Sequence, residues 1–138
     1  MTDSEKAKEL LEKGNYTLVL VSKDQIETDS LRGVHPLLNR MGKDYSSYSA
    51  ADKVIGKGAA FLYILLKIKN VSCHIISKPA LEIFRHYGIH VDYEKLVEHI
   101  YNHQKDGYCP VEEATSLVET PEEALPIIYE TLKKLGEK

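Results

Sequence analysis

A helix predicted over residues 59–69 constrains the fold most, because its side chains are hydrophobic on nearly every side. Such a helix offers no face to water, so we expect it to lie at the centre of the molecule. Apolar strands are predicted before and after it, over residues 53–55 and 71–76, and glycines separate the first strand from the helix. This alternation of strands and helices indicates an α/β fold.

The flanking sequence continues the alternation. A helix capped by Ser4 is predicted over residues 5–13 and is followed by a hairpin of strands over 16–22 and 25–28. The length of 138 residues and the 43% hydrophobic content suffice for one core, so we expect a single domain over residues 1–138. Further helices are predicted over residues 31–40, 80–87 and 110–118, and from residue 121 onward. A strand is predicted over 89–93, and residues 95–102 fit a strand or a short helix about equally well.

Charge and hydropathy narrow the classes of partner. A formal net charge of -3 provides no basic field for phosphates, so we expect no nucleic-acid partner. The apolar runs are too short to span a bilayer and the polar start does not resemble a signal peptide, so we expect a cytoplasmic protein with no membrane partner. In that compartment Cys73 and Cys109 are expected to be free thiols, with Cys73 in the core.

The sequence Gly56-Lys57-Gly58 opens the central helix. Free backbone N–H groups at a helix start, next to glycines and a lysine, suit an anionic group such as a phosphate or carboxylate. The spacing matches neither a Walker loop nor a dinucleotide-binding motif. Two interpretations stay open: an anion site, or glycines that allow tight packing of the central helix.

Cys109 precedes Pro110 at the start of another predicted helix. The helix dipole favours the thiolate there, which would lower the pKa of the thiol and make it a nucleophile, although Glu112 and Glu113 oppose this effect. The alternative is a small packing residue. Asn102 is a polar group shortly before Cys109, and we expect it to contribute to a ligand site.

The histidines include two pairs spaced four residues apart, His86 with His90 and His99 with His103. On one helix such a pair could share a metal ion. Gly88 interrupts the first pair, and the second lies across an uncertain element boundary. We therefore interpret all four as surface residues and expect neither a metal site nor a cofactor.

The sequence Asp-Lys-Val-Ile-Gly-Lys-Gly-Ala-Ala at residues 52–60, together with Cys-Pro-Val-Glu at 109–112, is similar to a prokaryotic family of unassigned function. That family has a cytidine deaminase-like fold without the zinc site, and the resemblance extends over about residues 16–113. Zinc deaminases open their core helices with His-Ala-Glu or Cys-Ala-Glu and with Pro-Cys-x-x-Cys. Here the corresponding residues are Lys-Gly-Ala at 57–59 and Pro-Ala-Leu-Glu-Ile at 79–83. His103 departs from the family pattern, which has arginine at that position.

The resemblance implies a three-layer α/β/α arrangement with a mixed sheet between helices. It also implies that the helix start at Lys57 lines the cleft that holds the base and the zinc in true deaminases. It implies no particular activity, because this fold hosts several functions.

The leading hypothesis is a zinc-independent protein that binds a small anionic ligand, a nucleotide by analogy with the fold, through Gly56, Lys57, Gly58 and Asn102. Whether it is an enzyme stays open. In an enzyme, Cys109 would be the nucleophile, Lys57 and backbone N–H groups would stabilise charge, and Asp52 or Glu112 would transfer the proton. The alternative is a non-catalytic module. We expect a homo-oligomer. If the protein is a non-catalytic module, the helix at 59–68 and the tyrosine-bearing loop at 44–49 would form the contact surface between its copies.

Overall fold

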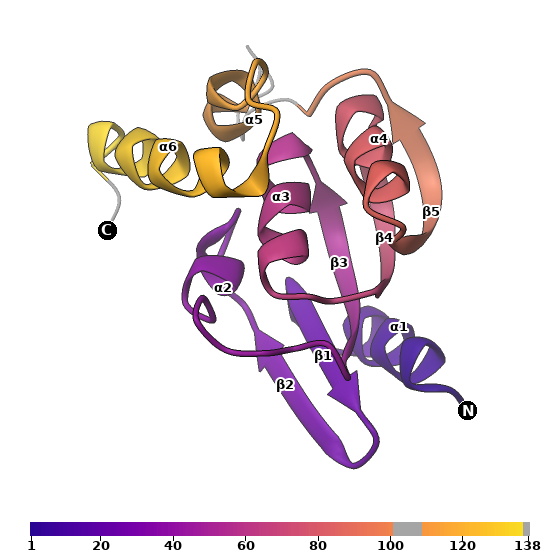
Figure 1. The fold of residues 1–138 in the computed structure, drawn as a ribbon. Helices are drawn as coiled ribbons and strands as arrows, with labels where there is room; N and C mark the ends of the chain where they lie inside the picture. The colour runs from indigo at the N-terminus through magenta and orange to yellow at the C-terminus, as the bar shows by residue number, and fades with distance from the viewer. Residues whose placement is uncertain (101–108, 137–138) are drawn as a thin grey trace.

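The computed structural model describes residues 1–100 and 109–136 (Figure 1). Helices and strands alternate along most of the chain, as the sequence predicts. In chain order the elements are α1 (Asp3–Lys13), β1 (Leu18–Ser22), β2 (Gln25–Asp29), α2 (His35–Leu38), β3 (Ser49–Ile55), α3 (Lys57–Leu65), β4 (Asn70–Ser77), α4 (Lys78–His86), β5 (His90–Val97), α5 (Pro110–Ala114) and α6 (Pro121–Lys134).

The strands form one mixed sheet in the order β2-β1-β3-β4-β5. β1 pairs antiparallel with both β2 and β3, whereas β3, β4 and β5 run parallel. The hairpin between β1 and β2 is confirmed, with Ser22 opposite Gln25 and Lys23 in the left-handed region at φ 53°. The α/β class is therefore confirmed, with a five-stranded mixed sheet.

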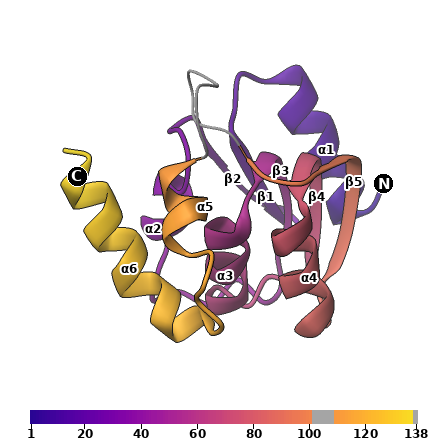
Figure 2. The ribbon, with the colours of Figure 1, turned by 90° about the horizontal axis from the view of Figure 1, so that it is seen from above.

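Helices cover both faces of this sheet (Figure 2). α1 lies on one face, where Ala7 and Leu11 pack against Val19, Val21 and Ala51. α3 and α4 lie on the other face, and α5 and α6 lie beside α3 (Figures 1 and 2). The larger core cluster is on this second side and is centred on α3.

α3 is enclosed, as its apolar composition requires. Phe61, Leu62 and Tyr63 have no exposed surface. The helix ends earlier than predicted, because Lys67 adopts a left-handed conformation at φ 66°. Since α3 is covered within its own chain, the prediction that residues 59–68 form an oligomer surface is wrong.

Several predicted helix starts are confirmed and one is corrected. The Ser77 hydroxyl accepts a hydrogen bond from the Ala80 N–H at the start of α4, and Thr120 caps α6. At α1 the cap is Thr2, which forms a capping box with Glu5, and not Ser4. In the parts of the chain that the structure describes, helices are too short or too polar to traverse a bilayer.

The tyrosine-bearing loop before β3 is anchored to the core. Tyr45 is buried and its hydroxyl donates to Glu27 Oε1 at 2.9 Å, while the Tyr48 hydroxyl donates to Gln25 Oε1 at 2.7 Å. Both rings meet edge to face, 5.0 Å apart. These contacts attach the loop to β2, and the loop offers little tyrosine surface for an oligomer contact.

Candidate functional site

A cavity of about 540 Å³ lies where β3 ends and α3 begins. Its walls come from the loop before α2, the end of β3, the start of α3, the start of α5 and the end of α6. The predicted site residues that line it are Asp52, Gly56, Gly58, Cys109 and Glu112. Asn102 falls outside the described residues. Residues about fifty positions apart in the sequence, such as Gly58 and Cys109, therefore line the same cavity.

The cavity walls are mainly apolar. Val54, Ile100 and Val111 contribute to them, together with Leu132 and Leu135 near the end of α6. Cationic side chains at the same cavity come from Arg32 and Lys53, which the sequence interpretation did not single out. An apolar space with a few charged groups is the usual composition of a small-molecule site.

Glu112 changes the interpretation of the α3 start. This buried carboxylate accepts the Lys57 N–H at Oε1, a long hydrogen bond of 3.4 Å, and the Ile100 N–H at Oε2. A carboxylate at a helix N-terminus is stabilised by the free N–H groups and the helix dipole. The anion expected at Gly56-Lys57-Gly58 is therefore supplied by the protein itself.

The glycines at the α3 start allow close packing. A Cβ on Gly58 would lie 2.5 Å from Val111 Cγ1, and one on Gly56 would lie 3.3 Å from Ile100 Cγ1. Hence α5 approaches α3 at Gly58 more closely than a side chain there would allow, whereas a side chain at Gly56 would require the Ile100 side chain to shift by a few tenths of an ångström. These contacts favour the packing interpretation of the two glycines over the anion-site interpretation.

Substitution Gly58→Ala is expected to destabilise the fold by about 1–2 kcal/mol. Glycine-to-alanine changes inside helices usually stabilise by about 1 kcal/mol, but the new methyl group would overlap Val111, which is itself buried. Urea unfolding of Gly58→Ala, Val111→Ala and the double variant measures the effect. A double variant less destabilised than the sum of the single changes is expected, whereas a Gly58→Ala protein more stable than the wild type would contradict the packing argument.

The Lys57 side chain lies elsewhere. Its Nζ donates to the Ser116 carbonyl at 2.8 Å and lies 5.9 Å from the centroid of the Phe61 ring, and the residue is absent from the cavity lining. The ammonium therefore ties the start of α3 to the segment after α5. To stabilise charge on a ligand, as predicted, it would have to leave the Ser116 carbonyl.

Asp52 lies on β3, partly buried beneath α3. Its Oδ2 accepts the Tyr63 hydroxyl at 2.6 Å and its Oδ1 accepts the Lys53 N–H at 2.8 Å. Burial raises the pKa of Asp52 to about 6, which these hydrogen bonds only partly oppose. Burial and the neighbouring Asp52 raise the pKa of Tyr63 well above its usual value, so the tyrosine acts as a donor. Asp52 can thus exchange a proton close to neutral pH.

The two thiols differ as predicted. Cys73 is a core residue on β4, and burial raises its pKa to about 12, which keeps it neutral. Cys109 is partly exposed and lines the cavity, with its N–H donating to the Ile100 carbonyl at 2.8 Å. α5 has only five residues, so the helix dipole at Cys109 is weak. Cys109 therefore differs from Cys73 mainly because it lines the cavity, and less because it stands at a helix start.

His86 and His90 do not share one helix. His86 ends α4 and His90 starts β5, with Gly88 in the left-handed region at φ 72° between them. The second pair cannot be compared, because His103 falls outside the described residues. The start of α4 carries Pro79 and Ala80.

Comparison with known proteins gives a family match over most of the chain. A family model described as "TM1506: Domain of unknown function (DUF1893)" matches residues 6–132. A crystal structure of a DUF1893 family protein (TM1506) from Thermotoga maritima superimposes with a TM-score of 0.83 and 26% sequence identity. The match covers 94% of this chain and 88% of the other. No curated protein matches the sequence.

Proposed function

Since the chain belongs to the DUF1893 family, whose description leaves the function open, we propose that it is a zinc-independent protein that binds a small anionic ligand in the cavity at the end of β3. The observation that carries the proposal is the cavity itself. Its volume of about 540 Å³ is of the size that accommodates small organic molecules.

The charges on the cavity walls indicate where the anionic group of the ligand would bind. The start of α3 already holds the Glu112 carboxylate, which would repel a second anion. Arg32 and Lys53 are cationic residues that line the cavity, and guanidinium and ammonium groups bind phosphates and carboxylates. The ligand we propose has an apolar body against Val54 and Val111, and its anionic group at Arg32 and Lys53.

The fold supports a nucleotide as the first ligand class to test. The parallel strands β3, β4 and β5, with α3 and α4 as the connecting helices, have the succession expected for a cytidine deaminase-like core. In deaminases the start of the first core helix lines the base-binding cleft. The zinc ligands of deaminases are replaced here by Lys57 and by the apolar residues after Pro79, which supports the zinc-independent form of the proposal.

An enzymatic version of the same proposal uses Cys109 as the nucleophile. Both oxygens of Glu112 accept backbone N–H groups, so moving a proton through this residue would disrupt the start of α3. Asp52 lines the same cavity and has a pKa of about 6, which suits proton transfer near neutral pH. Asp52 is therefore the better candidate for the proton-transfer role.

The ligand proposal predicts a rise in melting temperature with a nucleoside monophosphate. A ligand present at about one hundred times its Kd stabilises the native state by about 2.7 kcal/mol. A thermal-shift series with AMP, CMP and inorganic phosphate should show this rise for the wild type and for Lys43→Ala, an exposed lysine away from the cavity lining. The rise should be lost in Arg32→Ala and Lys53→Ala.

Two outcomes would contradict the ligand proposal. One is a wild type that none of the three compounds stabilises. The other is a full shift retained in both Arg32→Ala and Lys53→Ala. Iodoacetamide labelling followed by intact-mass measurement adds a second readout, because bound ligand should slow alkylation of Cys109 if the thiol faces the occupied cavity.

A homo-oligomer also stays a proposal, with a different surface from the one first expected. β5 lies at one end of the strand order, and most of its side chains are exposed, including Tyr93 and Leu96. An open strand edge with exposed apolar side chains can pair with a second copy. Light scattering on the purified protein measures the mass in solution.

A further inference from the structure

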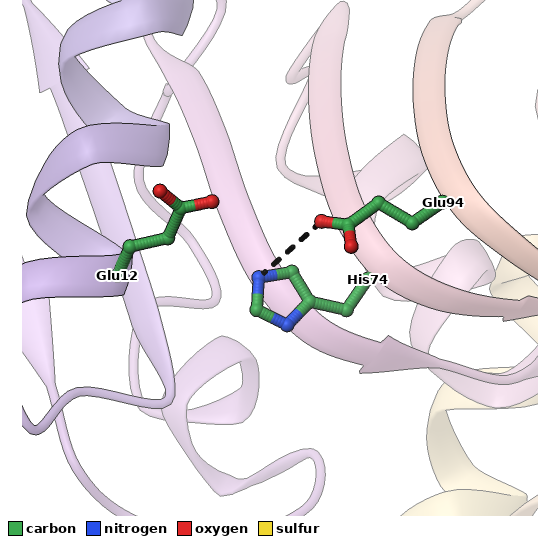
Figure 3. Close-up of side chains that lie close together, drawn as sticks. All are labelled: Glu12, His74 and Glu94. Carbon is green, nitrogen blue, oxygen red and sulfur yellow. Dashed lines mark ion pairs between the residues drawn. The ribbon is translucent and has the colours of Figure 1, made fainter.

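The face of the sheet that α1 covers carries a second group of side chains able to bind a ligand. Glu12 on α1, His74 on β4 and Glu94 on β5 point toward one another (Figure 3). One donor atom from each lies within 4.8 Å of the others, and His74 Nε2 is 3.8 Å from Glu94 Oε2. This group is separate from the cavity at the end of β3, which these residues do not line.

The backbone positions these three side chains. The register of β4 and β5 pairs Cys73 with Tyr93 and Ile75 with Lys95, so His74 and Glu94 are neighbours on adjacent strands. α1 is docked by Ala7 and Leu11, and the next residue after Leu11 is Glu12. The donors therefore come from elements far apart in sequence, each held by pairing or packing.

A small separate cavity coincides with the group. It measures about 60 Å³ and is lined by all three residues, with Lys8 and Asp92 among the others. This space is enough for an ion and one or two waters. Four acidic residues line it, Glu12, Asp52, Asp92 and Glu94, against the single ammonium of Lys8, so the local field favours a cation.

We propose that Glu12, His74 and Glu94 bind a divalent first-row transition metal ion, for which Zn²⁺ is the probe. One imidazole nitrogen and two carboxylate oxygens suit these ions, whereas Mg²⁺ and Ca²⁺ prefer oxygen ligands alone. Bonds of about 2.0–2.2 Å place two ligand atoms at most about 4.4 Å apart. Because Glu12 and Glu94 are exposed, they can close the remaining gap by side-chain rotation.

The bound ion would join α1 to β4 and β5. Without it, α1 is held to the sheet mainly by a small apolar cluster and by the contact of Ser4 Oγ with Ser72 Oγ at 3.3 Å. A metal bridge between a helix and two strands stabilises the folded chain, because the unfolded chain does not preserve the site. The site is therefore structural, and its three ligand residues are not part of the cavity proposed for the anionic ligand.

Isothermal titration of the untagged protein with Zn²⁺ tests the site. We expect one Zn²⁺ per chain in the wild type and at least a tenfold weaker Kd in His74→Ala, with a smaller loss in Glu12→Gln and Glu94→Gln. His86→Ala removes an exposed histidine on α4 and should bind within twofold of the wild type. Cys109→Ala should also bind as the wild type does, which separates this site from the thiol.

The melting temperature provides the second readout. Zn²⁺ should raise it in the wild type, His86→Ala and Cys109→Ala, and should not raise it in His74→Ala; an equal concentration of Mg²⁺ should leave the wild type unchanged. The proposal is overturned if His74→Ala binds Zn²⁺ as tightly as the wild type does. It is also overturned if the wild type binds no Zn²⁺ at a hundred micromolar or is stabilised equally by Mg²⁺.

Discussion

Replacing Glu112 with alanine is expected to lower the free energy of unfolding by about 3 kcal/mol. Glu112 is 5% exposed, and its carboxylate accepts the N–H groups of Lys57 and Ile100. Its removal leaves these donors without their acceptor in a partly buried setting and takes a negative charge from the start of α3. A buried donor without a partner costs about 1–3 kcal/mol, and the loss of the helix-end charge adds to it.

Urea unfolding of matched variants measures the contribution of Glu112. Glu113→Ala changes the neighbouring exposed carboxylate and should shift stability by less than about 0.5 kcal/mol. Glu112→Gln keeps one acceptor oxygen and should fall between the wild type and Glu112→Ala. Equal stabilities for Glu112→Ala and Glu113→Ala would show that the carboxylate does not hold the start of α3.

Through Asp52 alone, the free energy of unfolding is expected to fall by up to about 3 kcal/mol as the pH rises from 4 to 7. Burial raises the pKa of this carboxyl to about 6 in the folded chain, against about 3.9 in an unfolded one. Between these values the folded chain holds a proton that the unfolded chain has released. Raising the pH through 6 removes that proton and leaves a charge beneath α3, next to Tyr63 and Cys73, so stability present at low pH is lost.

The comparison with Asp52→Asn isolates this effect from other carboxylates. Some of these act in the opposite direction: the Ser46 N–H, for example, lowers the pKa of Asp44. The asparagine amide would still accept the Tyr63 hydroxyl but cannot ionise, so Asp52→Asn should gain stability relative to the wild type as the pH rises from 4 to 7. Asp24→Asn, in the exposed hairpin turn, controls for the loss of one charge. Parallel pH profiles for wild type and Asp52→Asn would refute the assignment.

Most of the fold follows from local pattern. The central position of α3 was predictable because a helix that is apolar on all sides must be buried. The hairpin and the caps at Ser77 and Thr120 were predictable because they depend only on neighbouring residues. The end of α3 was not predictable in this way. Leu66 and Ile68 are buried although they lie beyond the helix, so hydrophobicity continues where the helix does not.

Several of the residues proposed for the site line one cavity, but Lys57 does not, and the contacts of Glu112 were not predicted. Cys109 and the glycines at 56 and 58 were joined through the family resemblance, and they do line one cavity. The role of Glu112 was missed because its partners are backbone N–H groups, which no residue type reveals. The Glu12, His74 and Glu94 group was missed because its members lie on three elements, whereas histidine spacing indicates only sites within one helix.

The Glu112 carboxylate also bears on how this scaffold could evolve. Gly56 and Gly58 leave the start of α3 without side chains, and a single glutamate occupies the position that an outside anion would take. A lineage that shortened residue 112, after gaining stability elsewhere, would uncover backbone donors already aimed at an anion. The change at residue 112 would thus turn a self-capped helix start into one whose Lys57 N–H can donate to an outside anion.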